Sequence, residues 1–177
     1  MRTGRTRPQR AAAPRRRIAP RDRSRVLVEA AHPGAAALRA RVKRRARAFL
    51  RRLDVRGAEL SVLLVGDAAI RRLNRTWREE DRATDVLSFP AGEPVKGAPG
   101  PHPLGDVVIS LDTARRAARG GRRALEDEVD RYLAHGILHL LGYDHEKGAR
   151  EEKRMLTLER SLLGGRGAPP PLTRFEH

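Results

Sequence analysis

The segment from about Ala124 to Leu141 constrains the fold of this chain more than any other stretch. Five apolar residues recur in it at helical spacing, namely Leu125, Val129, Leu133, Ile137 and Leu140. Such a stripe predicts a helix that buries one face in a core. Any fold of the chain therefore has to offer this helix an apolar surface of matching length.

The segments before that helix predict a sheet. Four short apolar runs have the composition of strands, at 25–30, 59–65, 84–90 and 104–111. The last two are joined by a Pro/Gly loop short enough for an antiparallel pair. Further helices are expected from Gly34 to about Val55, from Asp67 through Trp77, from Asp112 to Gly120, and over about 149–163. We expect Asp67 and Asp112 to cap the helices that they begin.

This order of elements predicts an α+β fold with a central four-stranded mixed sheet covered by about five helices. The folded domain is expected over 25–163. Residues 1–24 combine three prolines with a block of arginines and are predicted to form a disordered basic arm. Residues 164–177 are predicted to form a disordered Pro/Gly tail.

The composition excludes several classes of site. The chain has no cysteine, which rules out disulfides, zinc-thiolate sites and thiol nucleophiles. No run of eighteen apolar residues is present, so no membrane span is expected. A cytoplasmic location is compatible with both observations. The arginine-rich start also resembles an organellar transit peptide, and this alternative stays open.

The net charge of +16 favours a polyanionic partner such as RNA. Ten arginines and one acid in residues 1–25 account for +9 of it, which leaves +7 on the rest. The helix from Gly34 carries a basic face, interpreted either as solvent-exposed or as RNA-contacting. Because 34 of the 38 basic residues are arginine, a GC-rich genome is a further explanation for part of the charge.

The sequence HGILHLLGYDH, residues 135–145, contains three of the six histidines. His135 and His139 are four residues apart, so a helix places both imidazoles on one face, one turn apart. Gly142 is expected to end the helix in a left-handed conformation, which lets the chain turn back so that His145 reaches the same point.

Three histidines without a fourth protein ligand indicate a catalytic metal site at the end of a helix. The fourth position of such a site stays open for water, and Zn²⁺ suits it best. Ni²⁺, Co²⁺ and Fe²⁺ are competing ions. The remaining histidines, His32, His102 and His177, lack such neighbours and are interpreted as structural.

The histidine spacing equals that of the metzincin proteases, whose motif has a glutamate as general base directly after the first histidine. Here that position is Gly136. Peptide hydrolysis by the same route therefore lacks its base.

The motif H-G-x-L-H-L-x-G-Y-D-H resembles that of the YbeY family, bacterial metal-dependent endoribonucleases of ribosomal RNA maturation. Three further stretches resemble the family in the same order, LNRTWREEDRATDVLSFP from Leu73, LGDVVISL from Leu104 and EEKRMLTLER from Glu151. The resemblance covers about 25–163.

This resemblance implies one zinc ion per chain, held by His135, His139 and His145, and a cytoplasmic enzyme acting on single-stranded RNA. Its substrate would be the ribosomal RNA precursor of the small ribosomal subunit, with roles in 16S 3′-end maturation and ribosome quality control. Arg78 matches the family's functionally important arginine, and a guanidinium can clamp a phosphate through two hydrogen bonds.

Three aspartates accompany these motifs. We interpret Asp85 and Asp106 as structural, and Asp144 either as structural or as orienting an imidazole. With few aromatic residues in the chain, no platform for stacking bases is expected, and RNA recognition should depend on phosphates.

The predicted function is thus a zinc-dependent endoribonuclease with His135 and Arg78 as catalytic residues. A metalloprotease and a noncatalytic, RNA-binding ribosome-assembly factor are the alternatives. The sequence leaves open the nucleophile, the cleavage position and the oligomeric state.

Overall fold

The structure is a computed structural model that describes residues 24–92, 99–144 and 148–164. The predicted arm and tail lie almost entirely outside these ranges. In chain order the elements are β1 (Arg25–Ala30), the 3-10 turn η1 (Ala36–Leu38), α1 (Arg39–Arg52), β2 (Ala58–Val65), α2 (Asp67–Arg78), β3 (Val86–Pro90), β4 (His102–Ser110), α3 (Leu111–Gly120), α4 (Leu125–Leu140) and α5 (Ala149–Leu163).

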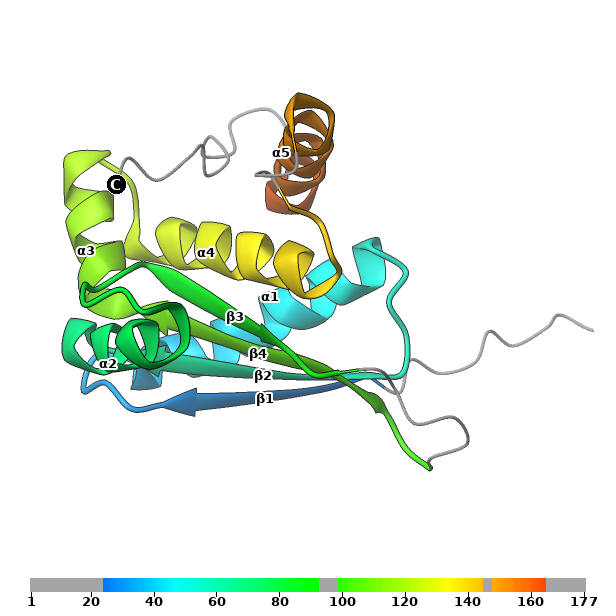
Figure 1. The fold of residues 1–177 in the computed structure, drawn as a ribbon, viewed down its shortest axis with the longest axis horizontal. Coiled ribbons are helices and arrows are strands. Elements are labelled where there is room, and N and C mark those ends of the chain that lie inside the picture. The colour runs from blue at the N-terminus through cyan, green and yellow to red at the C-terminus, as the bar shows by residue number, and fades with distance from the viewer. Residues whose placement is uncertain (1–23, 93–98, 145–147, 165–177) are drawn as a thin grey trace, which may run out of the picture.

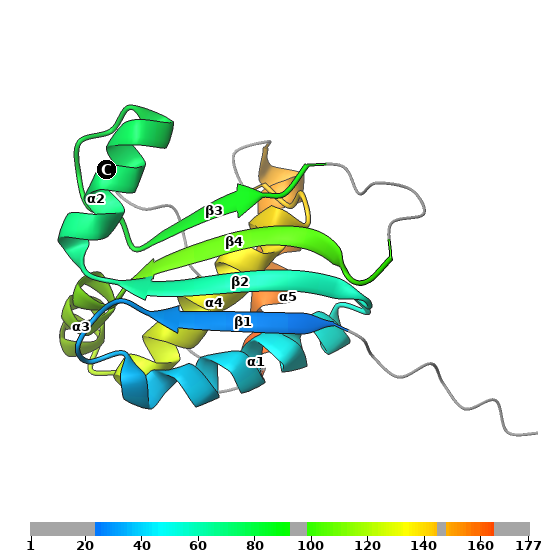
Figure 2. The ribbon, with the colours of Figure 1, turned by 90° about the horizontal axis from the view of Figure 1, so that it is seen from below.

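The four strands form one mixed sheet in the order β1-β2-β4-β3. Strands β1, β2 and β4 are parallel, whereas β3 pairs with β4 in the antiparallel direction. The predicted α+β fold and its antiparallel pair are confirmed. Since β3 has β4 as its neighbour in the sheet, it forms one edge (Figure 2).

Helices cover the two faces of the sheet unequally. On one face, alternate residues of β2 and β4 such as Leu64 and Ile109 share a core with α1, α3, α4 and α5. The other face carries a smaller cluster, in which Val65, Leu87 and Val108 pack against Ile70 of α2. Figure 2 shows α4 and α5 behind the strands and α1 along the β1 edge.

Helix α4 is buried on all sides rather than on one face. Every side chain from Glu128 to Leu138 is buried. The cause is its position, because α4 contacts α1, α3, α5, β3 and β4 (Figure 1). The predicted stripe of five apolar residues accounts for only part of the buried surface of α4. Buried polar side chains make up the rest.

The N-termini of α2 and α3 differ from our expectation about their caps. The N-cap residues are Gly66 and Ser110, not Asp67 and Asp112. The side chain of each aspartate instead accepts hydrogen bonds from residues at the start of the neighbouring helix. Asp112 Oδ2 accepts the Asp67 N–H at 3.0 Å, and Asp67 Oδ1 accepts the hydroxyls of Ser110 at 2.6 Å and Thr113 at 2.9 Å.

Adjacent parallel strands explain this exchange. Val65 and Ser110, the last residues of β2 and β4, are partners in the sheet register, so the two following helices start side by side. A carboxylate in the first turn of one helix is then within reach of the other. Arg116 completes the cluster by donating to Asp67 Oδ2 at 2.6 Å.

No helix within the described ranges is both long enough and apolar enough to cross a membrane.

We predict that Asp67→Asn destabilises the protein in a pH-dependent way. Partial burial works against ionisation of Asp67, but hydrogen bonds from Arg116, Ser110 and Thr113 outweigh it, so its pKa lies below the usual 3.8. The stabilisation is therefore complete above about pH 5 and is lost as the pH falls through the lowered pKa. Urea unfolding should show Asp67→Asn about 1–2 kcal/mol less stable at pH 7.

The difference between the two proteins should shrink towards pH 3. Glu29→Gln on the exposed face of β1 removes one negative charge as a control and should have little effect. A deficit of Asp67→Asn that is the same at pH 7 and pH 3 would contradict the assigned role of the Asp67 charge.

Candidate metal centre

The imidazoles of His135 and His139 meet at the last turns of α4. Their Nε2 atoms are 2.9 Å apart, and their ring centroids are 4.5 Å apart with the ring planes at 74°. This is the arrangement expected for an i, i+4 pair on one helix face. The structure thus brings together two of the three predicted metal ligands.

Glu159 of α5 holds the first of these imidazoles from behind. Its Oε1 lies 2.6 Å from Nδ1 of His135, and both side chains are buried, with Glu159 only 1% exposed. A carboxylate at Nδ1 favours the tautomer that has its proton there, which leaves the Nε2 lone pair of His135 directed at His139. The contact with Glu159 therefore orients the His135 imidazole as a metal ligand requires.

Glu159 was not among the residues predicted for the site. It lies among the apolar positions of α5, between Met155 and Leu162, which are both buried. A charged residue at helical spacing within an apolar stripe is rare without a buried partner. The place of Glu159 within the apolar stripe was therefore the signal in the sequence. The sequence alone does not identify its partner His135, which is 24 residues away.

The two nitrogen atoms fit a transition-metal ion in their chemistry. Two ligands of a tetrahedral zinc are roughly 3.3 Å apart, so the rings would have to separate by only a few tenths of an ångström. His145 lies outside the described residues. Within those residues, no group of three or more His, Asp or Glu side chains is placed to hold a metal, and the third ligand stays a prediction.

Gly142 ends α4 as predicted. Its φ is +84°, in the left-handed region that favours glycine. The N–H of Gly142 donates to His139 O at 2.9 Å, and that of Tyr143 donates to Leu138 O at 3.1 Å. These two bonds are those of a Schellman motif, which fixes the turn that leads towards His145.

Gly136 faces the sheet rather than the two imidazoles. A Cβ atom there would lie 2.7 Å from Cγ1 of Val107 and 3.1 Å from Oγ of Ser88. The Ser88 hydroxyl also donates to the Gly136 carbonyl at 3.1 Å, which joins α4 to β3. The departure from the protease motif at this position thus has a packing cause, because a glutamate would not fit between α4 and β4.

Comparison with known proteins identifies the family of the chain. The family model described as "Endoribonuclease YbeY" matches residues 30–166. The chain belongs to the YbeY family. It is 66% identical to the endoribonuclease YbeY of Myxococcus xanthus over 122 aligned residues. These residues make up 69% of this chain and 41% of that protein. The chain therefore spans less than half the length of that relative.

Other relatives match over more of their length. Identity to the endoribonuclease YbeY of Anaeromyxobacter sp. is 54%, over 80% of this chain and 72% of the relative. That of Aquifex aeolicus is 50% identical, over 70% of this chain and 80% of the relative. The solution structure of TM1509 from Thermotoga maritima is similar with a TM-score of 0.54 and 29% identity, covering 78% of this chain and 85% of that one.

Arg78, which we predicted from the resemblance to be a catalytic residue, is not in contact with the histidines. It is exposed at the C-terminal end of α2, on the sheet face opposite α4. Its side chain makes no hydrogen bond or ion pair with another described residue. The chain leads from Arg78 to Asp85 within seven residues, so one short connection links α2 to the neighbourhood of His135.

Asp85 is buried close enough to His135 for the two to interact electrostatically. Burial raises its pKa to about 6, against the opposing effects of the Val86 N–H and of His135. Its Oδ1 accepts from that N–H at 2.7 Å and from the Thr84 hydroxyl at 3.1 Å. Its Oδ2 has no hydrogen-bond partner among the described residues. The local hydrogen bonds agree with the structural role that we expected.

The other two aspartates differ in position. Asp106 is exposed and pairs in register with Phe89, so it lies on the α2 face of the sheet, away from the histidines. Asp144 is half-buried in the turn after Tyr143.

His32 is structural as expected, since its Nδ1 accepts the Gly34 N–H at 3.0 Å and its Nε2 contacts Asp112 at 3.2 Å.

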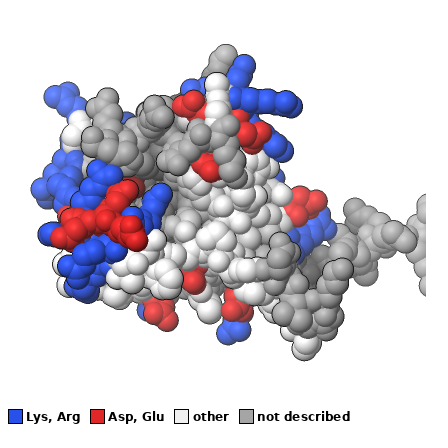
Figure 3. Space-filling model, in the orientation of Figure 1, with Lys and Arg blue, Asp and Glu red and all other residues white. Residues whose placement is uncertain are grey.

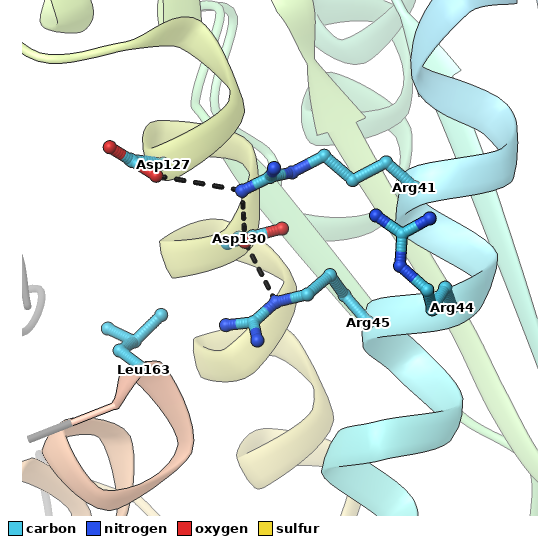
Figure 4. A pocket seen from close by; sticks show the side chains of 6 residues that line it. All are labelled: Arg41, Arg44, Arg45, Asp127, Asp130 and Leu163. Carbon is cyan, nitrogen blue, oxygen red and sulfur yellow. Dashed lines mark hydrogen bonds and ion pairs between the residues drawn. The ribbon is translucent and has the colours of Figure 1, made fainter.

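The basic face of α1 is not uniform. Arg41 and Arg45 both contact Oδ2 of the buried Asp130 at 2.8 Å, and Arg41 also lies 3.6 Å from Asp127 (Figure 4). With Arg44, they line a pocket of about 390 Å³ between α1, α4 and α5. Two of the arginines predicted to face solvent or RNA thus connect α1 to α4.

We predict that Gly136→Ala destabilises the domain by about 1–3 kcal/mol, because the added methyl group overlaps Val107 in a packed core. Thermal unfolding would measure this. The double variant Gly136→Ala/Val107→Ala should recover part of the loss. Gly120→Ala is the control, since a Cβ at Gly120 would have no heavy atom within 4 Å. Equal stability of the Gly136→Ala and Gly120→Ala variants would refute the packing explanation.

Proposed function

We propose that this chain is a zinc-dependent endoribonuclease that cleaves single-stranded RNA. The observation that supports it most is the convergence of the His135 and His139 Nε2 atoms, with the Glu159 carboxylate behind His135. The proposed substrate is the ribosomal RNA precursor of the small ribosomal subunit, with roles in 16S 3′-end maturation and ribosome quality control. The proposed location is the cytoplasm.

Zinc would be held by His135 and His139, with His145 as the third proposed ligand. When bound, such an ion supplies Lewis acidity that stabilises negative charge on the phosphate and promotes ionisation of water. The Glu159 carboxylate keeps the His135 imidazole oriented by accepting its Nδ1 proton. Because Glu159 is buried beside His135, solvent does not compete for that proton.

Arg78 is the proposed contact for the scissile phosphate. Its guanidinium is exposed and unengaged by the described residues, so it is available to a substrate oxygen. A planar, permanently charged group can donate two hydrogen bonds to a phosphate and stabilise the charge that grows there during cleavage. RNA bound over the edge strand β3 could reach both Arg78 and the histidines.

Two alternative functions lead to different expectations. A metalloprotease with the same zinc ligands would need a general base other than residue 136, where Gly136 packs against the sheet. A noncatalytic assembly factor would use the metal only to fix α4 and α5, so that metal loss would unfold the domain. Lys and Arg gather over α2 and α5 with acidic side chains among them (Figure 3). The net charge of +16 favours RNA over peptide as the substrate, which argues against the protease but not against the assembly factor.

Cleavage assays on the metal-quantified protein would separate these functions. We expect single-stranded RNA to be cut and duplex RNA and casein to stay intact. His139→Ala should lose zinc and RNA cleavage together, whereas Arg78→Ala should keep its zinc and lose about 10²- to 10³-fold in kcat. Arg72→Ala, another exposed arginine of α2, is the matched control and should behave as the unmodified chain.

Each contrary result identifies a different error. RNA cleavage that persists in zinc-free His139→Ala would exclude the zinc mechanism. Cleavage of casein alone would favour the protease. Binding of RNA without cleavage of any substrate would favour the assembly factor.

We further predict that Glu159→Gln lowers the zinc affinity about 10- to 100-fold, because an amide is a weaker acceptor for the Nδ1 proton than a carboxylate. Competition with a fluorescent chelator would measure it. Glu152→Gln, on the same helix but less buried, should bind zinc normally. Equal affinities of the two variants would show that Glu159 does not act on the metal through His135.

A further inference from the structure

A second pocket, of about 420 Å³, lies on α5 beside the turn that follows α4. One aromatic residue, three cations and two smaller side chains line it, namely Tyr143, Arg150, Lys153, Arg154, Thr157 and Leu158. Leu158 and Tyr143 are partly buried against the main core, so the floor of the pocket is apolar and anchored. The cations belong to the first two turns of α5.

The aromatic ring is held in place by the end of α4. The Schellman bond from the Tyr143 N–H to Leu138 O fixes its backbone, one turn beyond His139. The guanidinium of Arg154 lies over the ring, 5.0 Å from the centroid. Such a pair of planar groups is the kind of platform on which single-stranded nucleic acids stack a base.

The charges of the pocket are poorly compensated. Arg154 lies 3.9 Å from Glu151 and is 62% exposed at its side chain. The side chains of Arg150 and Lys153 are exposed and form no hydrogen bond or ion pair with other described residues. Thr157 donates its hydroxyl to the backbone carbonyl of Lys153, so it compensates neither cation. Two unengaged cations thus flank the platform.

We infer that this pocket is a nucleotide subsite for single-stranded RNA, in which one base stacks on Tyr143 and Arg154 while Arg150 and Lys153 hold the adjacent phosphates. The inference rests on the proposed function, because it places the subsite next to the scissile bond. Tyr143 follows His139 by four residues along a fixed turn, so RNA on this platform continues towards the imidazoles. The subsite would add base stacking to the phosphate contacts that we expected from the sequence.

Helix α5 connects the subsite with the metal centre. Its buried side carries Glu159, which orients His135, and its exposed side carries the three cations of the pocket. The spacing of Arg150, Lys153 and Arg154, at i, i+3 and i+4, places them on one face of the helix. An acidic peptide would satisfy those cations equally but would make no use of the aromatic ring.

The test is the kcat/KM of a short single-stranded RNA whose cleavage position has been mapped, compared with RNAs that carry one abasic nucleotide near that position. In the unmodified chain, one abasic position should lower kcat/KM about 5- to 100-fold. Tyr143→Leu should cause a similar loss with the intact RNA and no further loss with that abasic RNA. Tyr143→Phe keeps the ring, so it should retain the sensitivity to the abasic nucleotide that Tyr143→Leu loses.

The cations are tested through the salt dependence of RNA binding. Arg150→Gln and Lys153→Gln should each reduce the slope of log affinity against log salt by about one. Arg160→Gln makes the same change of charge on an exposed position of α5 outside the pocket and should leave the slope unchanged. Zinc content and thermal unfolding of every variant would show that fold and metal centre are intact.

The outcomes separate the subsite from the proposed function. If the unmodified chain cuts RNA and Tyr143→Leu, Arg150→Gln and Lys153→Gln cut and bind it equally well, the subsite is wrong and the function stands. If the unmodified chain neither binds nor cuts RNA, the proposed function fails, and the subsite fails with it. Binding of polyglutamate that is lost in Arg150→Gln, with no effect of Tyr143→Leu on RNA, would overturn the subsite in favour of an acidic protein partner.

Discussion

Burial of α4 on every side is the constraint on which the rest of the structure depends. A helix inside a single-domain core has no solvent face for its polar residues, and an unpaired buried charge is costly. Glu128 therefore pairs with Arg123 and Arg131, Asp130 with Arg41 and Arg45, and His135 with Glu159. These pairs tie α4 to its own N-terminal connection, to α1 and to α5. The candidate metal centre is one member of this set of buried polar contacts.

The depth at which α4 packs on the sheet sets the position of the histidines. Gly136 allows the helix to approach Val107 so closely that a methyl group would not fit between them. One residue earlier, His135 projects from a different side of the helix towards α5 and finds Glu159 there. Close packing at residue 136 and an oriented imidazole at residue 135 are thus consequences of the same docking.

Local patterns predicted the elements well, because strand composition, helical spacing and Gly142 act over a few residues. The mixed sheet and the turn after α4 follow from such signals. The contacts that the sequence did not reveal are long-range. Asp67 and Asp112 each bond to the start of the other's helix, because β2 and β4 are neighbours. Arg41 and Arg45 pair with Asp130, because α1 lies beside α4. In the site, the spacing of His135 and His139 was informative, whereas Glu159 required the docked α5.

The docking of α5 also gives a physical reason why the metal centre and the Tyr143 pocket should depend on each other. This helix packs against α4, and Met155 and Leu162 are its fully buried apolar residues. A small rotation of α5 about its axis would withdraw Glu159 from His135 and, at the same time, move Arg154 off the Tyr143 ring. Both interactions stabilise the same helix orientation. On the proposed function, ligands that favour either interaction favour the other, so RNA and zinc should bind with positive coupling.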